Sequence, residues 1–364
     1  MNICFFHGGF SLHGGIGRVV SILANGMSEN SDYSVYSLSF YKDGKDKAFD
    51  IKPSVAEFYL HDQPVSMTKS ILTNGILKLC KFIKKHDISV LIGCGALYYP
   101  LTVICARLCR LQSICWEHTN PEFTKDYKFQ NIARKIGARL SNVNVLVSNE
   151  AKDNYDKRFP KSKNVLIWNP AAEELFEQSC EYNPKTLNIV SVGRLSYPKN
   201  FMRLLSIAKK LDDVNKKDWK WDIYGDGEER GALENEIKRL DLAKRVELKG
   251  NVNDMYCRYH NYSLIVMTSR YEGFPMVLIE GAANGLPMVS FDIKTGPKEI
   301  IVNGVNGYLI NSEDDDAMVT AIDKLLKDKD LRLNMSKTSK ATADKFSLNN
   351  ILAKWDDVLR TGND

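Results

Sequence analysis

Hydrophobic residues in the first half of the chain form short continuous runs separated by segments with helical spacing. The continuous runs predict buried strands at 2–7, 33–40, 88–93, 113–118 and 143–148. Between them, the segments 18–27, 69–85 and 127–140 carry apolar residues three or four positions apart, which predicts helices. Continuous apolar strands that alternate with helices are typical of a parallel sheet covered on both faces.

The same pattern begins again after a polar, acidic stretch at 173–185. We therefore expect two doubly wound, Rossmann-like α/β domains, at 1–170 and 171–345, with a hinge within 168–186. The amphipathic end of the chain, 346–364, is expected to form a helix that crosses back to the first domain. The strands predicted in the second half are 187–193, 219–225, 245–250, 264–269, 287–292 and 307–310, and the helices are about 200–212, 229–241, 275–284, 298–303 and 314–328.

The overall composition is that of a globular protein larger than one core. The chain has 364 residues, of which 44% are hydrophobic and 26% are charged. Its net charge of +5 comes from residues 1–185, with 23 Lys/Arg against 18 Asp/Glu, while the rest balances at 27 against 27. This asymmetry indicates either a face for phosphates or anionic lipid, or simply a solubilising surface. Nucleic-acid binding would require a stronger basic stripe.

Cysteine usage and the amino terminus indicate the cytoplasm. The eight cysteines form no C-x-x-C pair and several lie in apolar runs, as expected of reduced core residues. The first residues carry no charged lead or cleavage site, so no signal peptide is expected. No uncharged apolar run approaches the roughly 18–20 residues that span a bilayer. Any membrane contact should therefore be peripheral, at the inner face.

Two glutamates flank the start of a predicted helix. Glu272 and Glu280 are eight positions apart, Pro275 is expected at the first helical position, and Gly285 lies just past the end. Eight helical steps advance ~12 Å, so the two carboxylates could bind hydroxyls at opposite ends of an elongated ligand, with a phosphate at the helix N-terminus. The alternative is an acid favoured by the helix dipole and one solvent-facing glutamate.

Other familiar motifs are absent or have simpler explanations. The turn 14–18 lacks the third glycine of a dinucleotide fingerprint, and no acid ends the strand 33–40, which disfavours a nicotinamide enzyme. The triplet Asp314–Asp316 fits an Asp-x-Asp metal motif but precedes a predicted helix, where acids are common caps. No cluster has metal-ligand spacing, so we expect neither a metal nor a cofactor.

The segment 269-SRYEGFPMVLIEGAANGLPMVSFD-292, followed by 295-TGPKEII-301, resembles the retaining GT-B glycosyltransferases of family 4. Their signature is an E-x7-E pair, an apolar helix, a Gly-x-Pro and a glycine-containing loop. The motifs 14-GGIGR-18, 193-GRLSYPKN-200 and 225-GDGEER-230 follow the family's order and cover both halves of the chain. The TGPKEI variant is similar to the subgroup that builds bacterial surface polysaccharides.

The resemblance implies a role for each matching residue. Glu272 would bind hydroxyls of the donor sugar and Glu280 those of the ribose, while Arg194 and Lys199 would hold the diphosphate. His118, at the end of strand 113–118, would lie near the reaction centre; the alternative is a structural hydrogen-bonding role. The remaining implied donor-site residues are Gly15 and Gly17 at the β-phosphate, Gly225 and Gly227 beside the base, and Thr295, Gly296 and Pro297 near the sugar, together with Gly273 and Phe274.

The predicted function is a retaining, metal-independent hexosyltransferase. It would move a hexose or N-acetylhexosamine from a nucleotide sugar, preferably a UDP sugar, to a glycan or lipid-linked saccharide in cell-surface polysaccharide synthesis. Two alternatives are a nucleotide-sugar 2-epimerase on the same fold and a non-catalytic nucleotide-sugar-binding protein.

Two further features concern the acceptor and the membrane. His7 and His13 flank the first turn and could contact the acceptor. The segments 125–139 and 78–85 interleave basic with apolar and aromatic residues, which suits either an anionic membrane surface or an ordinary solvated helix face.

Overall fold

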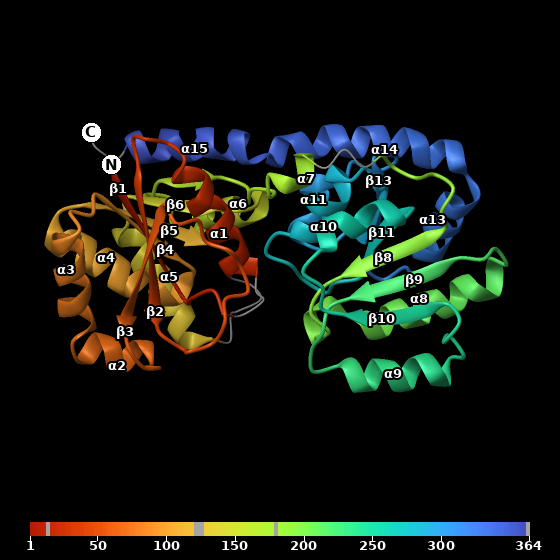
Figure 1. The fold of residues 1–364 in the computed structure, drawn as a ribbon, viewed down its shortest axis with the longest axis horizontal. Helices are drawn as coiled ribbons and strands as arrows, with labels where there is room; N and C mark the ends of the chain where they lie inside the picture. Colours follow the sequence, from red (N-terminus) through yellow and green to blue (C-terminus); the bar gives the residue numbers. More distant parts are fainter. Residues whose placement is uncertain (12–14, 120–126, 178–180, 362–364) are drawn as a thin grey trace. The chain divides into compact units, whose positions relative to one another are not determined.

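The computed structural model describes residues 1–11, 15–119, 127–177 and 181–361. It divides into two compact units, one of Met1–Pro170 with Leu348–Asp364 and one of Ala171–Ser347 (Figure 1). Each unit is a parallel sheet with helices, as the alternation of apolar strands and amphipathic helices predicts.

The described strands of the first unit form a seven-stranded sheet in the order β3-β2-β1-β4-β5-β6-β7, with every neighbouring pair parallel. The strands are β1 (Asn2–His7), β2 (Ser34–Tyr41), β3 (Val55–His61), β4 (Val90–Cys94), β5 (Gln112–Glu117), β6 (Val143–Leu146) and β7 (Asn164–Leu166). The helices are α1 (Gly15–Met27), α2 (Met67–Leu72), α3 (Gly75–Lys85), α4 (Tyr99–Cys109), α5 (Lys128–Leu140), α6 (Asn149–Arg158) and α15 (Leu348–Arg360).

The second unit repeats this winding in the order β10-β9-β8-β11-β12-β13, again with parallel pairs. Its strands are β8 (Asn188–Val192), β9 (Lys220–Tyr224), β10 (Val246–Gly250), β11 (Leu264–Met267), β12 (Met288–Phe291) and β13 (Gly307–Ile310). Its helices are α7 (Glu174–Glu177), α8 (Phe201–Val214), α9 (Arg230–Arg239), α10 (Met255–Arg258), α11 (Met276–Ala283), α12 (Pro297–Ile300), α13 (Asp315–Lys327) and α14 (Lys329–Ala343).

Both sheets reverse their winding at one place, between β1 and β4 in the first unit and between β8 and β11 in the second. Loops that leave two such neighbouring strands at their carboxyl ends diverge to opposite faces of the sheet, which opens a crevice where α/β proteins bind ligands. In the second unit, the loops after β8 and β11 contain Lys199 and Glu272.

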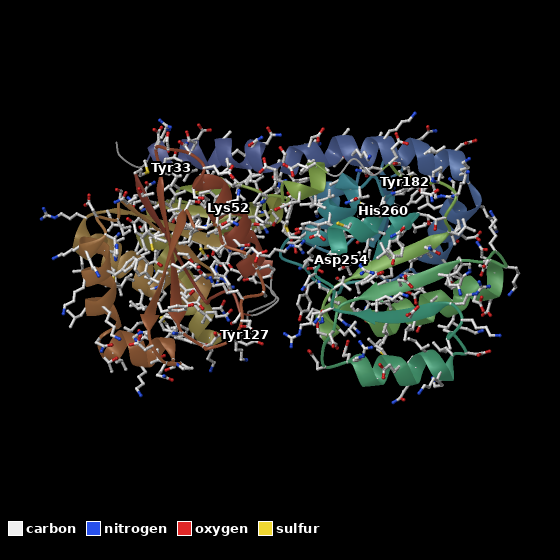
Figure 2. The ribbon with its side chains drawn as sticks, in the orientation of Figure 1. Tyr33, Lys52, Tyr127, Tyr182, Asp254 and His260 are labelled. Carbon is white, nitrogen blue, oxygen red and sulfur yellow. The ribbon has the colours of Figure 1, made fainter. Side chains whose placement is uncertain are left out.

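The C-terminal helix α15 packs on the first unit, which confirms the predicted crossover. Trp355 is fully buried and its ring lies 5.0 Å from that of Trp116 on β5. Gln112 Nε2 donates to the carbonyl of Val358 at 3.0 Å. Tyr33, labelled in Figure 2, donates a hydrogen bond to the Asp356 carboxylate.

Some local predictions were wrong. The helix predicted over 69–85 is two helices, because the chain turns sharply at Thr73 and Asn74. The turn is so tight that a Cβ on Gly75 would lie 2.7 Å from the carbonyl oxygen of Ser70. Helix α4 was not predicted, because burial around most of its circumference leaves a continuous apolar run instead of a helical stripe.

Within the described part of the chain, no helix is both long enough and apolar enough to cross a membrane.

Candidate active site

The loops after β8 and β11 are joined through their backbones. Arg270 N donates to the carbonyl of Pro198 at 2.8 Å. Thr268 Oγ1 donates to the carbonyl oxygens of Lys199 and Asn200, each at 3.3 Å. Asn200 adopts a left-handed conformation with φ of 58°, which turns the chain from the loop into α8. These contacts fix the two loops against each other.

The structure brings Lys199 and Glu272 into direct contact in this region. Lys199 Nζ lies 2.6 Å from Glu272 Oε1, and the side chains are 22% and 11% exposed. Ser269 Oγ donates to the same carboxylate oxygen at 2.7 Å. The ammonium has three N–H donors and the carboxylate has further lone pairs, so both groups retain capacity for a ligand.

Arg194 lies on the same loop as Lys199 but faces solvent. Its side chain is 70% exposed and its Nη2 lies 3.1 Å from Glu228 Oε2. An exposed ion pair of this kind contributes about 0–1 kcal/mol. A phosphate could therefore replace Glu228 as the partner of Arg194 at little cost to the fold.

The glycines of the 225–227 turn are required for backbone packing. A Cβ on Gly225 would lie 1.9 Å from the carbonyl oxygen of Gly193, and one on Gly227 would lie 2.3 Å from that of Leu195. Leu195 N also donates to the Asp226 carbonyl at 3.0 Å. The turn thus supports the loop that carries Arg194, a role that the sequence did not indicate.

Thr295 and Gly296 pack against the residues just before α11, Glu272 and Pro275. Thr295 is fully buried and its hydroxyl donates a hydrogen bond to the backbone carbonyl of Glu272. Gly296 has φ of 98°, and a Cβ there would lie 2.2 Å from Cδ of Pro275. Thr295 therefore holds the backbone of Glu272, in place of a direct position on the surface of a sugar pocket.

Helix α11 begins at Met276, so Pro275 is the residue before the helix and not its first member. Glu280 lies on this helix and is only 1% exposed. Tyr259 Oη donates to Glu280 Oε2 at 2.7 Å. The alternative interpretation of Glu280 as a solvent-facing glutamate is therefore wrong.

The side chain of Phe274 points into the protein interior. Its ring centroid lies 5.7 Å from that of Phe346, and both rings are buried. Phe274 therefore has a packing role, and Gly273 beside it is half-buried.

In the first unit, His118 directly follows β5 and is buried against Trp116, with ring centroids 4.3 Å apart. Burial lowers the pKa of His118 to about 3, so the imidazole is neutral near pH 7. Among the described residues, His118 Nε2 has no hydrogen-bond partner.

A buried ion pair anchors the residues on either side of His118. Arg134 Nε lies 2.8 Å from Glu117 Oε2, and Tyr155 Oη donates to the same oxygen at 2.9 Å. Thr119 donates to Glu117 Oε1 through its hydroxyl at 2.8 Å and through its backbone N–H at 3.2 Å. Glu117 thereby holds the backbone around His118 in a fixed turn.

The other first-unit predictions have mixed outcomes. A Cβ on Gly15 would meet nothing within 4 Å, whereas one on Gly17 would lie 3.4 Å from the carbonyl oxygen of Gly9. His7 is fully engaged: Nε2 bonds Ser37 Oγ at 2.8 Å and Nδ1 accepts from Gly9 N at 3.0 Å. The ring of His7 therefore has a structural role, not acceptor contact. His13 lies outside the described residues.

The acidic triplet caps a helix, as the alternative to metal binding predicted. Asp314 accepts from Ala317 N at 2.8 Å at the start of α13. Asp315 pairs with Arg203 and Asp316 with Lys210. Among the described residues, no group of three or more His, Cys, Asp or Glu is placed to hold a metal ion.

In the described part of the basic segment 125–139, only some of the side chains are exposed. Tyr127, labelled in Figure 2, and Ile132 are exposed at 61% and 55%. Lys128 and Lys135 are also exposed, but Arg134 is buried against Glu117. Including Arg134 in a membrane-facing set was therefore wrong, and Lys125 lies outside the described residues.

Both units of the chain are similar in sequence to known proteins. Residues 173–342 match the model of the family described as glycosyl transferases group 1. The amylovoran biosynthesis glycosyltransferase AmsD of Erwinia amylovora is 31% identical over 96% of this chain and 97% of that protein. A Campylobacter jejuni alpha-1,4-N-acetyl-D-galactosaminyltransferase named for a PP-undecaprenol-linked saccharide is 24% identical over 66% of this chain and 65% of its own.

The fold is also similar to a solved structure. Staphylococcus aureus TarM, in a complex with fondaparinux, alpha-GlcNAc-glycerol and UDP, superposes with a TM-score of 0.83 at 15% identity. The similarity covers 98% of this chain and 99% of that one, which confirms the predicted two-domain α/β fold.

Proposed function

The chain belongs to the glycosyl transferases group 1 family, and from this premise we propose that it transfers a hexose or N-acetylhexosamine from a UDP sugar. The transfer would retain the anomeric configuration, need no metal ion, and extend a glycan or lipid-linked saccharide in cell-surface polysaccharide synthesis. The observation that carries the proposal is the contact of Lys199 Nζ with Glu272 Oε1 at the switch point between β8 and β11.

The charges at this switch point suit a sugar linked to a diphosphate. The Glu272 carboxylate can accept hydrogen bonds from sugar hydroxyls, while the Lys199 ammonium has donors left for a phosphate oxygen. Arg194, on the same loop, supplies a second cation through a weak and exchangeable ion pair. Positive groups fixed where leaving-group charge develops lower the barrier, so these side chains would stabilise the departing diphosphate without a metal.

Retention of configuration is taken from the resemblance to the retaining family-4 enzymes, and the engagement of the two carboxylates bears on how it could be achieved. A double displacement would require one carboxylate to act as nucleophile, with a second about 5 Å away. Here Glu272 is paired with Lys199, and Glu280 is buried on α11 with a bond from Tyr259. We therefore favour same-face substitution, in which the acceptor oxygen bonds the anomeric carbon as the C–O bond to the diphosphate breaks. The acceptor proton passes to a phosphate oxygen.

Relatives support the choice of substrates. The TarM structure contains UDP, AmsD is named for amylovoran biosynthesis, and the Campylobacter enzyme is named for an undecaprenol-linked saccharide. A lipid-linked acceptor would place the enzyme at the inner face of the membrane. The exposed Lys128 and Ile132 on α5, with Tyr127 just before it, offer basic, apolar and aromatic groups for such a surface.

A donor screen tests the proposal. Thermal unfolding would be followed with UDP, UDP-glucose, UDP-galactose, UDP-N-acetylglucosamine, UDP-N-acetylgalactosamine and GDP-mannose, each with and without EDTA. We expect UDP to stabilise the protein and one UDP sugar to stabilise it further, because only the matching sugar adds contacts at Glu272. Equal stabilisation by GDP-mannose would contradict the choice of nucleotide, and loss of the effect in EDTA would contradict metal independence. Incubation of the matching donor alone, followed by analysis for an epimer, separates the transferase from a 2-epimerase.

A further inference from the structure

We infer that the buried hydroxyl of Tyr259 orients the Glu280 carboxylate toward the ribose hydroxyls of the nucleotide, which makes Tyr259 a determinant of ribonucleotide selectivity. The inference rests on the proposed function, in which Glu280 binds the ribose. Tyr259 belongs to none of the sequence motifs, and only the folded chain places it beside Glu280.

The contact joins the two segments that flank β11. Tyr259 begins a short 3-10 turn, Tyr259–Asn261, ahead of the strand, and Glu280 lies on α11 after it. Tyr259 is 0% exposed and Glu280 is 1% exposed, and the oxygen atoms are 2.7 Å apart. The bond is therefore shielded from water, which strengthens it electrostatically.

A buried carboxylate is an expensive way to stabilise a fold. Removing a carboxylate from water is unfavourable, and an apolar pair of similar volume is often as stable or more stable. Tyr259 Oη donates to Glu280 Oε2 at 2.7 Å, so the phenol fixes the position of that oxygen. A carboxylate held in this way offers hydrogen-bond acceptors, which suits ligand hydroxyls.

Orientation is the property that the phenol controls. The last torsion of a glutamate side chain, between sp3 and sp2 atoms, is broad and weakly restricted. A donor fixed on Oε2 selects one rotation of the carboxylate plane and thereby aims the lone pairs of both oxygens. Without it, part of the binding free energy of the ribose would be spent on ordering the carboxylate.

The test compares binding of UDP and 2′-deoxy-UDP by isothermal titration calorimetry. A site built to bind a hydroxyl discriminates strongly against an analogue that lacks it, so the wild-type protein should prefer UDP by about tenfold or more. Tyr259→Phe and Tyr259→Met, which both remove the hydroxyl and keep apolar volume, should lower this preference by about threefold or more. Glu280→Gln should lower the preference for UDP at least as much. Adding Tyr259→Phe to Glu280→Gln should change this preference little further.

Tyr262→Phe is the matched control. Tyr262 is also buried, and its hydroxyl donates to Asp222 Oδ2 at 2.7 Å and lies 2.8 Å from Tyr224 Oη. Tyr262 lies three positions after Tyr259, and this variant removes a buried phenol hydroxyl from a different carboxylate, that of Asp222. It should therefore lower thermal stability without changing the preference for UDP.

The outcomes separate this inference from the proposed function. If Glu280→Gln loses the preference while both Tyr259 variants keep the wild-type value, Tyr259 does not orient Glu280 and the inference is overturned. An equal change in Tyr262→Phe would also overturn it, because the effect would then be a general result of losing a buried hydroxyl. If the wild-type protein does not bind UDP, the proposed donor site itself is wrong and the inference fails with it. If it binds UDP and 2′-deoxy-UDP equally, the donor site stands but its ribose hydroxyl is not recognised, and the inference alone is overturned.

Discussion

Lys199 Nζ contacts Glu272 Oε1 at 2.6 Å although the two residues are 73 positions apart in the chain. The sheet order explains the contact, because β8 and β11 are neighbours and the loops that follow them carry these two side chains. Cation and carboxylate form an ion pair in a partly buried position. A ligand with both hydroxyls and phosphates can use both groups.

Replacement of Glu272 by alanine should remove transfer and leave nucleotide binding nearly intact. The carboxylate faces the sugar in the proposed mechanism, so we expect turnover to fall by about a hundredfold or more, while the Kd for UDP changes by less than about threefold. Initial-rate measurements give the turnover, and titration with UDP gives the Kd. Glu228→Ala, which removes the exposed partner of Arg194, is the control and should retain turnover. An equal loss of UDP affinity in Glu272→Ala and Glu280→Ala would contradict the separate roles of the two glutamates.

Replacement of Arg194 by alanine should reduce turnover more than it weakens donor binding. The guanidinium is exposed, so its ion pair with Glu228 contributes little to the fold, and the thermal midpoint should stay close to that of the wild type. Stabilisation of the leaving diphosphate would act mainly in the transition state, which lowers kcat and leaves the donor KM almost unchanged. Unchanged kcat would rule out this role.

Stability of the first unit should fall as the pH falls below about 6.5. Burial lowers the pKa of His118 to about 3 and that of His7 to about 4, from ordinary values of 6.5. The unfolded chain binds these protons near pH 6.5 and the folded chain does so only near pH 3 to 4, so the stabilisation is complete above pH 6.5 and is lost on acidification. At pH 5, each histidine should account for a loss of about 2 kcal/mol. Urea unfolding at pH 7.5 and at pH 5 measures the loss in the free energy of unfolding. In His118→Gln, the difference between the two pH values should be smaller than in the wild type. A difference that is unchanged in this variant would contradict the assignment.

Removal of Arg134 should destabilise the first unit strongly. Loss of one partner from a buried ion pair leaves an uncompensated charge, here that of Glu117, and costs about 3–5 kcal/mol. Lys135→Ala is a close control, because its side chain is the exposed neighbour on the same helix and should change stability by less than about 0.5 kcal/mol. Similar unfolding midpoints for the two variants would show that Glu117 is neutralised in another way.

The sequence predicted the two sheets, because continuous apolar strands are a local signal, whereas the grouping of Lys199 with Glu272 at one proposed donor site came from the family resemblance. It could not distinguish ligand contact from support. Thr295 and Phe274 belong to the motif, yet Thr295 binds a backbone carbonyl and Phe274 packs on Phe346. Tyr259 and the buried state of Arg134 left no local signal, because each depends on a partner brought close by the fold, Glu280 and Glu117.

Binding to anionic vesicles should depend on the exposed residues of α5 and of Tyr127 just before it. Tyr127 and Ile132 are mainly exposed, with Lys128 and Lys135 nearby, so aromatic and apolar groups can enter the lipid headgroup region while the lysines attract anionic lipid. We expect sedimentation with vesicles that contain phosphatidylglycerol, weaker binding to pure phosphatidylcholine, and a loss of about tenfold in Ile132→Glu. Met202→Glu, on an exposed position of the second unit, is the control and should bind as the wild type does. If Ile132→Glu also binds normally, the exposed side chains beside α5 are an ordinary solvated helix face and the membrane contact proposed there is wrong.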